Sequence, residues 1–274
     1  MMKKILVLLL AFFVLPIPVF VAARATQEPL RLPIVMYHQL TTRPGRAGAY
    51  TLTLDQFECD LQYLRAAGYE SITLRELLDW SDGLCELPEK PMMITFDDGY
   101  ETTGVWAAPL LEQYGFTGLM AVVGSVAQHY TDTPDHTLAY SHHDWEAVAA
   151  VSRGETLEVQ SHTWDMHELG ARRGCSRMLG EENLTYRATL TADLARFEEI
   201  AALNGVKTVP GIAFPYGLYC DETIAIVRDM GYRAAFTCNE YVNRLTRDPD
   251  ELLALARFNR PAGRTSEQFF AVWG

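Results

Sequence analysis

The regular alternation of short apolar runs with longer amphipathic segments is the feature that most constrains the fold of this chain. Runs with the length and composition of buried strands occur at residues 32–37, 70–73, 91–96, 117–123, 157–161, 211–214 and 234–237, with a further candidate at 253–258. Helical periodicity occurs between them, at residues 54–67, 74–79, 103–114, 144–152, 190–203 and 221–230. Strands that alternate with helices are typical of βα units and of a mostly parallel sheet. About seven such strands predict an α/β fold, a distorted (β/α)7-type barrel.

The first 25 residues have the pattern of a secretory signal peptide. A short basic start precedes an apolar run over residues 5–23, and Ala23-Arg24-Ala25 fits a cleavage site. An uncleaved membrane anchor is the alternative, although two prolines interrupt the run. We therefore expect a secreted or envelope-associated protein that contacts a membrane only through this segment. The rest has no repeat or linker, so residues 26–274 are predicted to form one domain, and we expect a monomer.

Charge and cysteine content narrow the partners and the kind of site. The formal net charge of −12 makes nucleic acid an unsuitable partner. An exported protein can form disulfides, but five cysteines leave at least one unpaired. The cysteines show no Cys-x-x-Cys spacing, which argues against a cysteine metal cluster. Cys220 and Cys238 follow two successive predicted strands, so we predict that they pair.

Polar residues that can carry chemistry follow several of the predicted strands. They are His38, the pair Asp97-Asp98, His162 and the pair Pro215-Tyr216. In parallel α/β folds, functional residues gather at the carboxyl ends of the strands. The sequence therefore predicts that these residues share one edge of the sheet.

A carboxylate and two imidazoles at this edge could hold a metal ion. Asp97-Asp98-Gly99 alone is a common turn sequence, but here it lies between an apolar strand and a helix. His162 and His167 are five residues apart and cannot share a helix face. A strand-end histidine and one beyond a short turn can nevertheless converge on one ion with an open position for water.

The combined motifs resemble the polysaccharide deacetylases of carbohydrate esterase family 4, the NodB-homology domain. The likeness covers roughly residues 32–260. It rests on Val35-Met36-Tyr37-His38, Thr95-Phe96-Asp97-Asp98-Gly99-Tyr100, Ser161-His162-Thr163 with His167, Phe214-Pro215-Tyr216-Gly217 and the segment from Gly231 to Phe236. The position of Tyr37-His38 near the start, and the spacing of the two later histidines, resemble the circularly permuted branch that includes poly-N-acetylglucosamine deacetylases.

The resemblance implies a metal-dependent hydrolysis of N-acetyl groups on a β-linked N-acetylglucosamine polysaccharide. Asp98, His162 and His167 would bind one divalent ion, with Zn²⁺ favoured over Co²⁺ or Ni²⁺. Asp97 would be the general base, and His38 the acid that protonates the leaving amine. The backbone N–H of Tyr216 would help to hold the oxyanion.

Substrate contacts are assigned less directly. Trp164, Pro215 and Tyr216 are predicted to contact the sugar, with Trp164 preferred over Tyr50 and Tyr219 for stacking on a ring. The histidines at 129, 136, 142 and 143 lie in or beside a predicted polar loop at 125–141 and are expected to be solvated.

One departure from the family leaves the orientation of the base open. Many members carry an arginine just before the Pro-Tyr-Gly turn, whereas this chain has Ala213 and Phe214 there. Arg257 and Arg260 are the candidates to replace it. Two other functions stay open, namely an amidase or esterase that acts on a smaller acylated substrate and a sugar-binding domain without catalysis.

Overall fold

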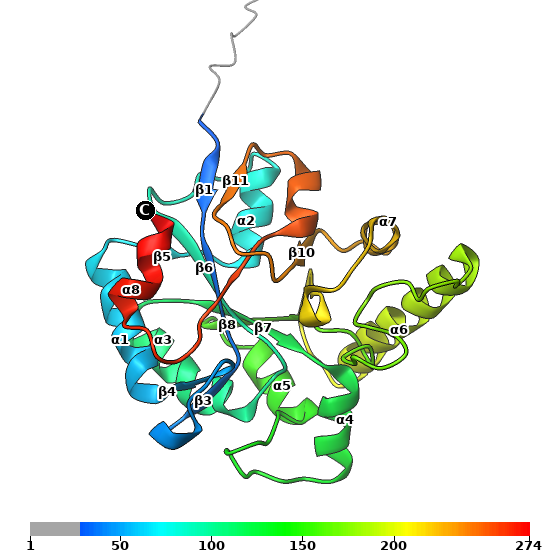
Figure 1. The fold of residues 1–274 in the computed structure, drawn as a ribbon, viewed down its shortest axis with the longest axis horizontal. Coiled ribbons are helices and arrows are strands. Elements are labelled where there is room, and N and C mark those ends of the chain that lie inside the picture. Colours follow the sequence, from blue (N-terminus) through cyan, green and yellow to red (C-terminus); the bar gives the residue numbers. More distant parts are fainter. Residues whose placement is uncertain (1–27) are drawn as a thin grey trace, which may run out of the picture.

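The computed structural model describes residues 28–274, so the predicted signal peptide at residues 1–25 lies outside the described part of the chain. Its centre is a curled parallel sheet with the strand order β10-β9-β8-β7-β6-β2-β12 (Figure 1). These strands are β10 (Ala234–Phe236), β9 (Thr208–Ala213), β8 (Leu157–Ser161), β7 (Gly118–Val122), β6 (Pro91–Phe96), β2 (Ile34–Tyr37) and β12 (Phe258–Asn259). The distorted barrel with parallel strands is therefore confirmed.

Short strands extend this sheet and support its ends. β5 (Glu70–Ser71) pairs with the start of β6. β1 (Leu30–Leu32) pairs antiparallel with β11 (Asn243–Leu245). β3 (Gln39–Thr41) pairs with β4 (Thr51–Thr53), and this pairing closes the loop that follows β2.

Helices surround the sheet, and most begin at a residue that caps the helix. They are α1 (Leu54–Ala66), α2 (Leu74–Ser81), α3 (Ala108–Tyr114), α4 (Gly124–Asp132), α5 (Trp145–Ser152), α6 (Asn183–Leu203), α7 (Asp221–Asp229) and α8 (Ser266–Phe270). The side chains of Thr53, Thr73 and Asp144 accept hydrogen bonds from the first turns of α1, α2 and α5. Within residues 28–274, the helices all lack the length and apolar character needed to cross a membrane.

Two predicted elements differ from the structure. The predicted loop at 125–141 begins with the helix α4, because Ala127 packs into a cluster with Trp145 and Phe197, and this tertiary contact outweighs a weak local preference. The candidate strand at 253–258 is instead the end of a 3-10 helix (Pro249–Ala254) followed by β12. Asp248 accepts a hydrogen bond from the backbone of Asp250 and starts this 3-10 helix.

The predicted disulfide between Cys220 and Cys238 is wrong, because all five cysteines are free. The Cys220 thiol faces the cluster between α6 and α7, where its Sγ lies 3.3 Å from Oγ1 of Thr223. Cys238 instead packs against Gly217, where an added Cβ would lie 2.7 Å from the Cβ of Cys238. The two side chains therefore have different surroundings.

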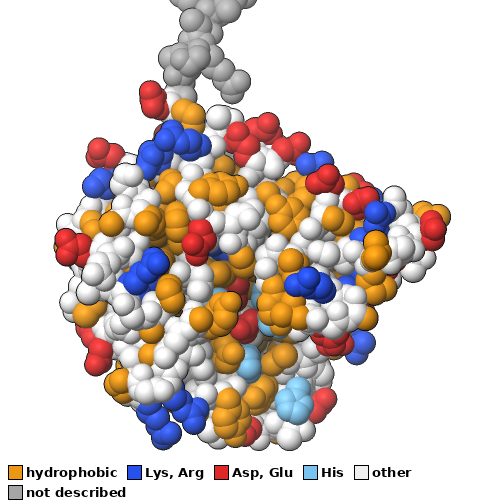
Figure 2. All heavy atoms as spheres, viewed as in Figure 1, with side chains coloured by type: hydrophobic (Ala, Val, Ile, Leu, Met, Phe, Trp, Pro, Cys, Tyr) orange, Lys and Arg blue, Asp and Glu red, His pale blue; other side chains and the backbone are white. Residues whose placement is uncertain are grey.

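The sheet opens on one face of the molecule. Figure 2 shows a hollow in the middle of this face, with histidine and acidic side chains inside it and hydrophobic side chains around it.

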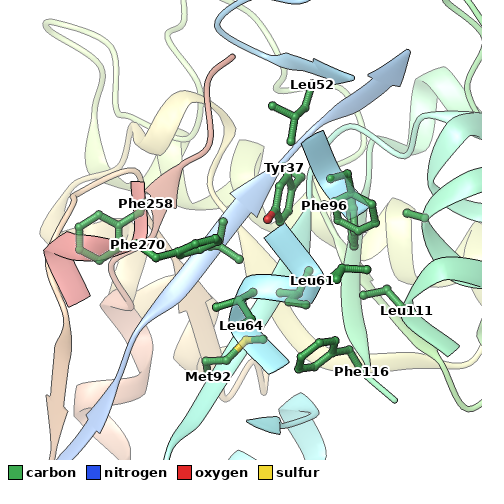
Figure 3. Close-up of a cluster of buried hydrophobic side chains, with 14 of the residues drawn as sticks. Tyr37, Leu52, Leu61, Leu64, Met92, Phe96, Leu111, Phe116, Phe258 and Phe270 are labelled. Atoms are coloured by element: carbon green, nitrogen blue, oxygen red, sulfur yellow. The ribbon is translucent and has the colours of Figure 1, made fainter. Parts of the chain in front are cut away.

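The core beneath β2 and β6 is aromatic and includes one buried ionic group. The Tyr37 ring stacks on Phe96 at 5.6 Å (Figure 3). It also meets Phe57 of α1 edge-on at 5.0 Å. Its hydroxyl donates to Asp60 Oδ2 at 3.0 Å. Arg260, the residue after β12, donates to both oxygens of Asp60, from Nε at 2.8 Å and from Nη2 at 3.0 Å. Arg260 is therefore a structural cation that joins the end of β12 to α1.

We predict that Asp60→Ala lowers the free energy of unfolding by about 3–5 kcal/mol, because it leaves the buried guanidinium of Arg260 without its counter-ion. Asp60 is fully buried and Arg260 is 2 % exposed. Urea unfolding followed by circular dichroism measures the change. The control is Asp79→Ala on the exposed side of α2, which should shift stability by less than about 0.5 kcal/mol. Equal effects of the two substitutions would contradict the prediction.

Candidate active site

Strand register brings the predicted residues to one edge of the sheet. Tyr37 of β2 pairs with Phe96 of β6, so His38 and Asp97 leave their strands at the same level. Val122 of β7 pairs with Ser161 of β8, which places His162 along the same edge. The polar residues that follow these strands therefore meet in space.

Three of these side chains converge on one point. The ligand atoms of Asp98, His162 and His167 all lie within 4.8 Å of one another. Oδ1 of Asp98 is 3.5 Å from Nε2 of His162 and 3.2 Å from Nε2 of His167. Within residues 28–274, this buried oxygen has no hydrogen-bond partner. Two ring nitrogens and one carboxylate oxygen that approach without bonding to each other fit a divalent cation.

The second nitrogen of each imidazole is already engaged. Nδ1 of His162 lies 2.8 Å from the carbonyl oxygen of Ala213, which can only accept a hydrogen bond, so Nδ1 carries the proton. Nδ1 of His167 lies 3.2 Å from the Tyr216 hydroxyl. Hydrogen bonds of this kind orient metal-binding histidines and leave Nε2 as the ligand.

Asp97 lies beside this cluster and is held by Arg257. Nη1 of Arg257 donates to Oδ1 of Asp97 at 2.7 Å and Nη2 donates to Oδ2 at 2.8 Å, and both side chains are buried. Burial raises the pKa of the Asp97 carboxyl, but the charge and hydrogen bonds of Arg257, together with the nearby imidazoles of His162 and His38, hold this pKa below its ordinary value. Of the two candidate arginines, Arg257 is the one that orients Asp97.

His38, the predicted general acid, lies beside Tyr50. The two ring centroids are 4.9 Å apart, and Nδ1 of His38 has no hydrogen-bond partner within residues 28–274. Burial lowers the pKa of His38 more than the nearby carboxylates of Asp97 and Asp98 raise it. His38 is therefore a half-buried imidazole with at least one nitrogen free for proton transfer.

Backbone conformation at the site is unusual. Asp98, Thr163 and Tyr216 are non-glycine residues with positive φ, at 69°, 72° and 58°. Left-handed conformations of this kind cost about 1–3 kcal/mol each and cluster at functional sites. Tyr216 lies in a 3-10 helix (Pro215–Gly217), where the first N–H groups have no intrahelical acceptor. Tyr216 is 42 % exposed and its ring centroid lies 4.6 Å from that of His167, so it presents an aromatic ring to the site.

Trp164 does not lie in the site. Its ring is 6 % exposed, belongs to the same cluster as Phe197 and has the guanidinium of Arg196 at 4.3 Å. The prediction that Trp164 stacks on a sugar is therefore corrected, because this ring is part of the core. Tyr219, the weaker candidate, also stacks inside the protein, on Phe214 at 5.0 Å.

Two histidines near the site were expected to be solvated and are not. His142 stacks on the Tyr100 ring at 4.2 Å, and Nε2 of His143 accepts a hydrogen bond from the backbone of Gly104 at 3.2 Å. Burial lowers the pKa of each to about 4. A bridge between the backbones of Tyr100 and His142 brings this segment beside the Asp97-Asp98 turn. Local sequence gave no indication of this long-range contact.

Comparisons with known proteins agree with this geometry. The profile of the polysaccharide deacetylase family matches residues 85–235, more than half of the chain. A poly-β-1,6-N-acetyl-D-glucosamine N-deacetylase of Staphylococcus aureus is 26 % identical over 198 residues. That alignment includes 70 % of this chain and 62 % of the relative, so the chain spans less than two thirds of this relative's length.

Solved structures share the fold over most of the chain. IcaB from Ammonifex degensii is 25 % identical with a TM-score of 0.69, over 86 % of this chain and 93 % of that one. The Streptococcus pyogenes deacetylase PplD, in complex with acetate, is 20 % identical with a TM-score of 0.71, over 90 % and 99 %.

The matched range contains the three converging ligands, the Asp97 carboxylate and the Pro-Tyr-Gly turn, whereas His38 and Arg257 lie outside it. Of the strands in the central sheet, β2, which leads into His38, comes first along the chain, in the order of the permuted branch. By its sequence and its fold, this chain belongs to the polysaccharide deacetylase family.

Proposed function

We propose that this protein is a metal-dependent deacetylase that hydrolyses N-acetyl groups of a β-linked N-acetylglucosamine polysaccharide. The observation that carries the proposal is the convergence of Asp98, His162 and His167 beside a separate carboxylate, Asp97, that Arg257 holds in place. The activity named for the Staphylococcus aureus relative supports the choice of polymer. The apolar start of the chain supports action outside the cell or in its envelope.

The metal would be held by Oδ1 of Asp98 and Nε2 of His162 and His167. A bound divalent cation supplies Lewis acidity, which lowers the pKa of water and polarises a carbonyl. We propose Zn²⁺ as the resident ion, with Co²⁺ or Ni²⁺ as alternatives, because two imidazoles and one carboxylate suit each of them. Hydrogen bonds from the rings to Ala213 and Tyr216 keep both Nε2 atoms available.

Asp97 takes the proton from the attacking water in this proposal. Arg257 uses one N–H on each carboxylate oxygen, and a carboxylate has further lone pairs that remain free to accept a proton. Because the pKa of Asp97 is held below its ordinary value, the carboxyl is ionised at neutral pH and ready to act as a base.

The remaining residues act on the acetyl oxygen and on the amide nitrogen during cleavage. The backbone N–H of Tyr216 donates to the acetyl oxygen as it becomes negative. His38 gives a proton to the nitrogen when the C–N bond breaks, so hydrolysis consumes one water and releases acetate and a free amine. The position of His38 close to the carboxylates of Asp97 and Asp98, with Nδ1 unpartnered within residues 28–274, suits this role.

The proposal is tested by acetate release after metal removal. Chelated protein should release no acetate from N-acetylglucosamine oligomers, and Zn²⁺, Co²⁺ or Ni²⁺ should restore release. An aryl acetate assayed in parallel separates the alternatives: acetate from the ester alone would favour an esterase for smaller substrates. Release from neither substrate by metal-loaded protein would leave a sugar-binding domain.

We predict that Asp97→Asn lowers kcat at least 10²-fold and leaves Zn²⁺ affinity within about threefold, because an amide cannot act as the base but the three ligands remain. Asp98→Asn is the matched comparison and should weaken Zn²⁺ binding. Isothermal titration with Zn²⁺ and acetate release measure the two effects. A loss of metal binding in Asp97→Asn would show that the two aspartates have the opposite roles.

We predict that Tyr216→Phe weakens Zn²⁺ binding about tenfold, because it removes the hydrogen-bond partner of His167 Nδ1 and keeps the ring. Competition with a chromophoric chelator measures the affinity without turnover. Tyr219→Phe is the control, since that ring stacks on Phe214 instead. Unchanged affinity in Tyr216→Phe would show that this hydroxyl does not position the ligand.

A further inference from the structure

A second concave surface lies beside β12, the strand that pairs with β2 ahead of His38. It encloses a volume of about 520 Å³, and its lining includes Glu240, Tyr241, Phe258, Asn259, Arg264 and Val272. These residues come from the segment after β10, from β12 and from the C-terminal region with α8. None of them takes part in the chemistry proposed above.

The pocket is joined to the site through Asn259. Asn259 pairs with Met36 of β2, two residues before His38. Its Nδ2 donates to the carbonyl oxygen of Ala49 at 3.0 Å. The next residue is Tyr50, whose ring lies against His38. Ala49 and Tyr50 therefore connect Asn259, which lines the pocket, to His38 in the site.

The segment that carries Tyr50 is fixed rather than free. The backbone N–H of Gln39 in β3 donates to the carbonyl oxygen of Tyr50 at 3.1 Å. The N–H of Ala262 donates to Gly48 at 2.9 Å, which ties the same segment to the chain after β12. The exposed ring of Tyr50 is therefore held in place beside the site, which limits the entropy cost of binding.

The side chains of Tyr50 and of the pocket combine apolar faces with polar groups. Tyr50 is 62 % exposed, Tyr241 52 % and Val272 51 %. Large apolar side chains that are exposed around a concave surface mark ligand-binding grooves. Oδ1 of Asn259 is buried and has no hydrogen-bond partner within residues 28–274.

The charge of the pocket favours a neutral ligand. Glu240 and Arg264 contribute opposite charges, and Oε1 of Glu240 already accepts a hydrogen bond from the backbone of Asn259 at 3.1 Å. A pyranose ring has an apolar face for an aromatic ring and hydroxyls for a carboxylate, an amide and a guanidinium.

We propose that Tyr50 and the pocket of Asn259 and Tyr241 form a second subsite, which binds a neighbouring N-acetylhexosamine residue of the polymer whose acetyl group is at the metal centre. This inference rests on the proposed function for the identity of the ligand. It makes the protein selective for chains rather than for single sugars, because a short substrate reaches the metal centre without filling the pocket.

Binding in the Asp97→Asn background, loaded with Zn²⁺, tests the subsite without turnover. Isothermal titration compares a dimer with a pentamer of β-1,6-linked N-acetylglucosamine. The parent should bind the pentamer more tightly than the dimer. Tyr50→Ala and Tyr241→Ala should each reduce the pentamer-to-dimer affinity ratio about tenfold, as expected for the loss of one aromatic stacking contact.

Matched variants make the result specific. Tyr50→Phe and Tyr241→Phe keep the rings and should keep the ratio. Leu203→Ala should also keep it, because this exposed residue ends α6 at the opposite edge of the sheet. An unchanged ratio in both alanine variants, or equal affinity of the parent for dimer and pentamer, would overturn the subsite. A parent chain that shows the ratio and its loss, but whose wild-type form releases no acetate, would refute the proposed function and leave the subsite standing.

Discussion

The arrangement of the site depends on one buried ion pair, between Arg257 and Asp97. Taking both charges out of water is costly, and the pair is tolerated because its hydrogen bonds are satisfied. Arg257 donates to both oxygens of Asp97, and its Nε donates to the carbonyl oxygen of Thr237 at 3.0 Å. The guanidinium thereby joins the turn after β6, the residue after β10 and the residue before β12. Both edges of the curled sheet are held at the level of the site.

The same ion pair separates the roles of two adjacent aspartates. Arg257 occupies Asp97 on one side, while the positive φ of Asp98 turns the next carboxylate toward His162 and His167. A single aspartate could not accept hydrogen bonds from Arg257 on both oxygens and also present an unpartnered oxygen to a metal. The left-handed residue between strand and helix is thus the local cost of placing a base and a ligand side by side.

The strand ends could be predicted from the sequence, because apolar runs and the residues after them are local features. The choice between Arg257 and Arg260 could not, since it depends on which side of β12 each side chain leaves. Arg257 turns to Asp97, whereas Arg260 turns to Asp60 beneath the sheet. The burial of His142 depends on a backbone bridge to Tyr100 across 42 positions, and the burial of Trp164 depends on the packing of α6. The disulfide prediction was wrong for a similar reason, because strand order says nothing about the direction of the Cys220 and Cys238 side chains.

The residues inside the family match and those outside it have different proposed roles. Residues 85–235 include the three converging side chains of the proposed metal site, the proposed base Asp97 and the Pro-Tyr-Gly turn. His38, Tyr50 and the pocket beside β12 come from the two ends of the described chain. The pairing of β2 with β12, through Val35 with Phe258 and Met36 with Asn259, brings these ends together. Changes in the loop after β2 or in the chain after β12 would therefore alter the proposed subsite and leave the proposed metal site and base in place.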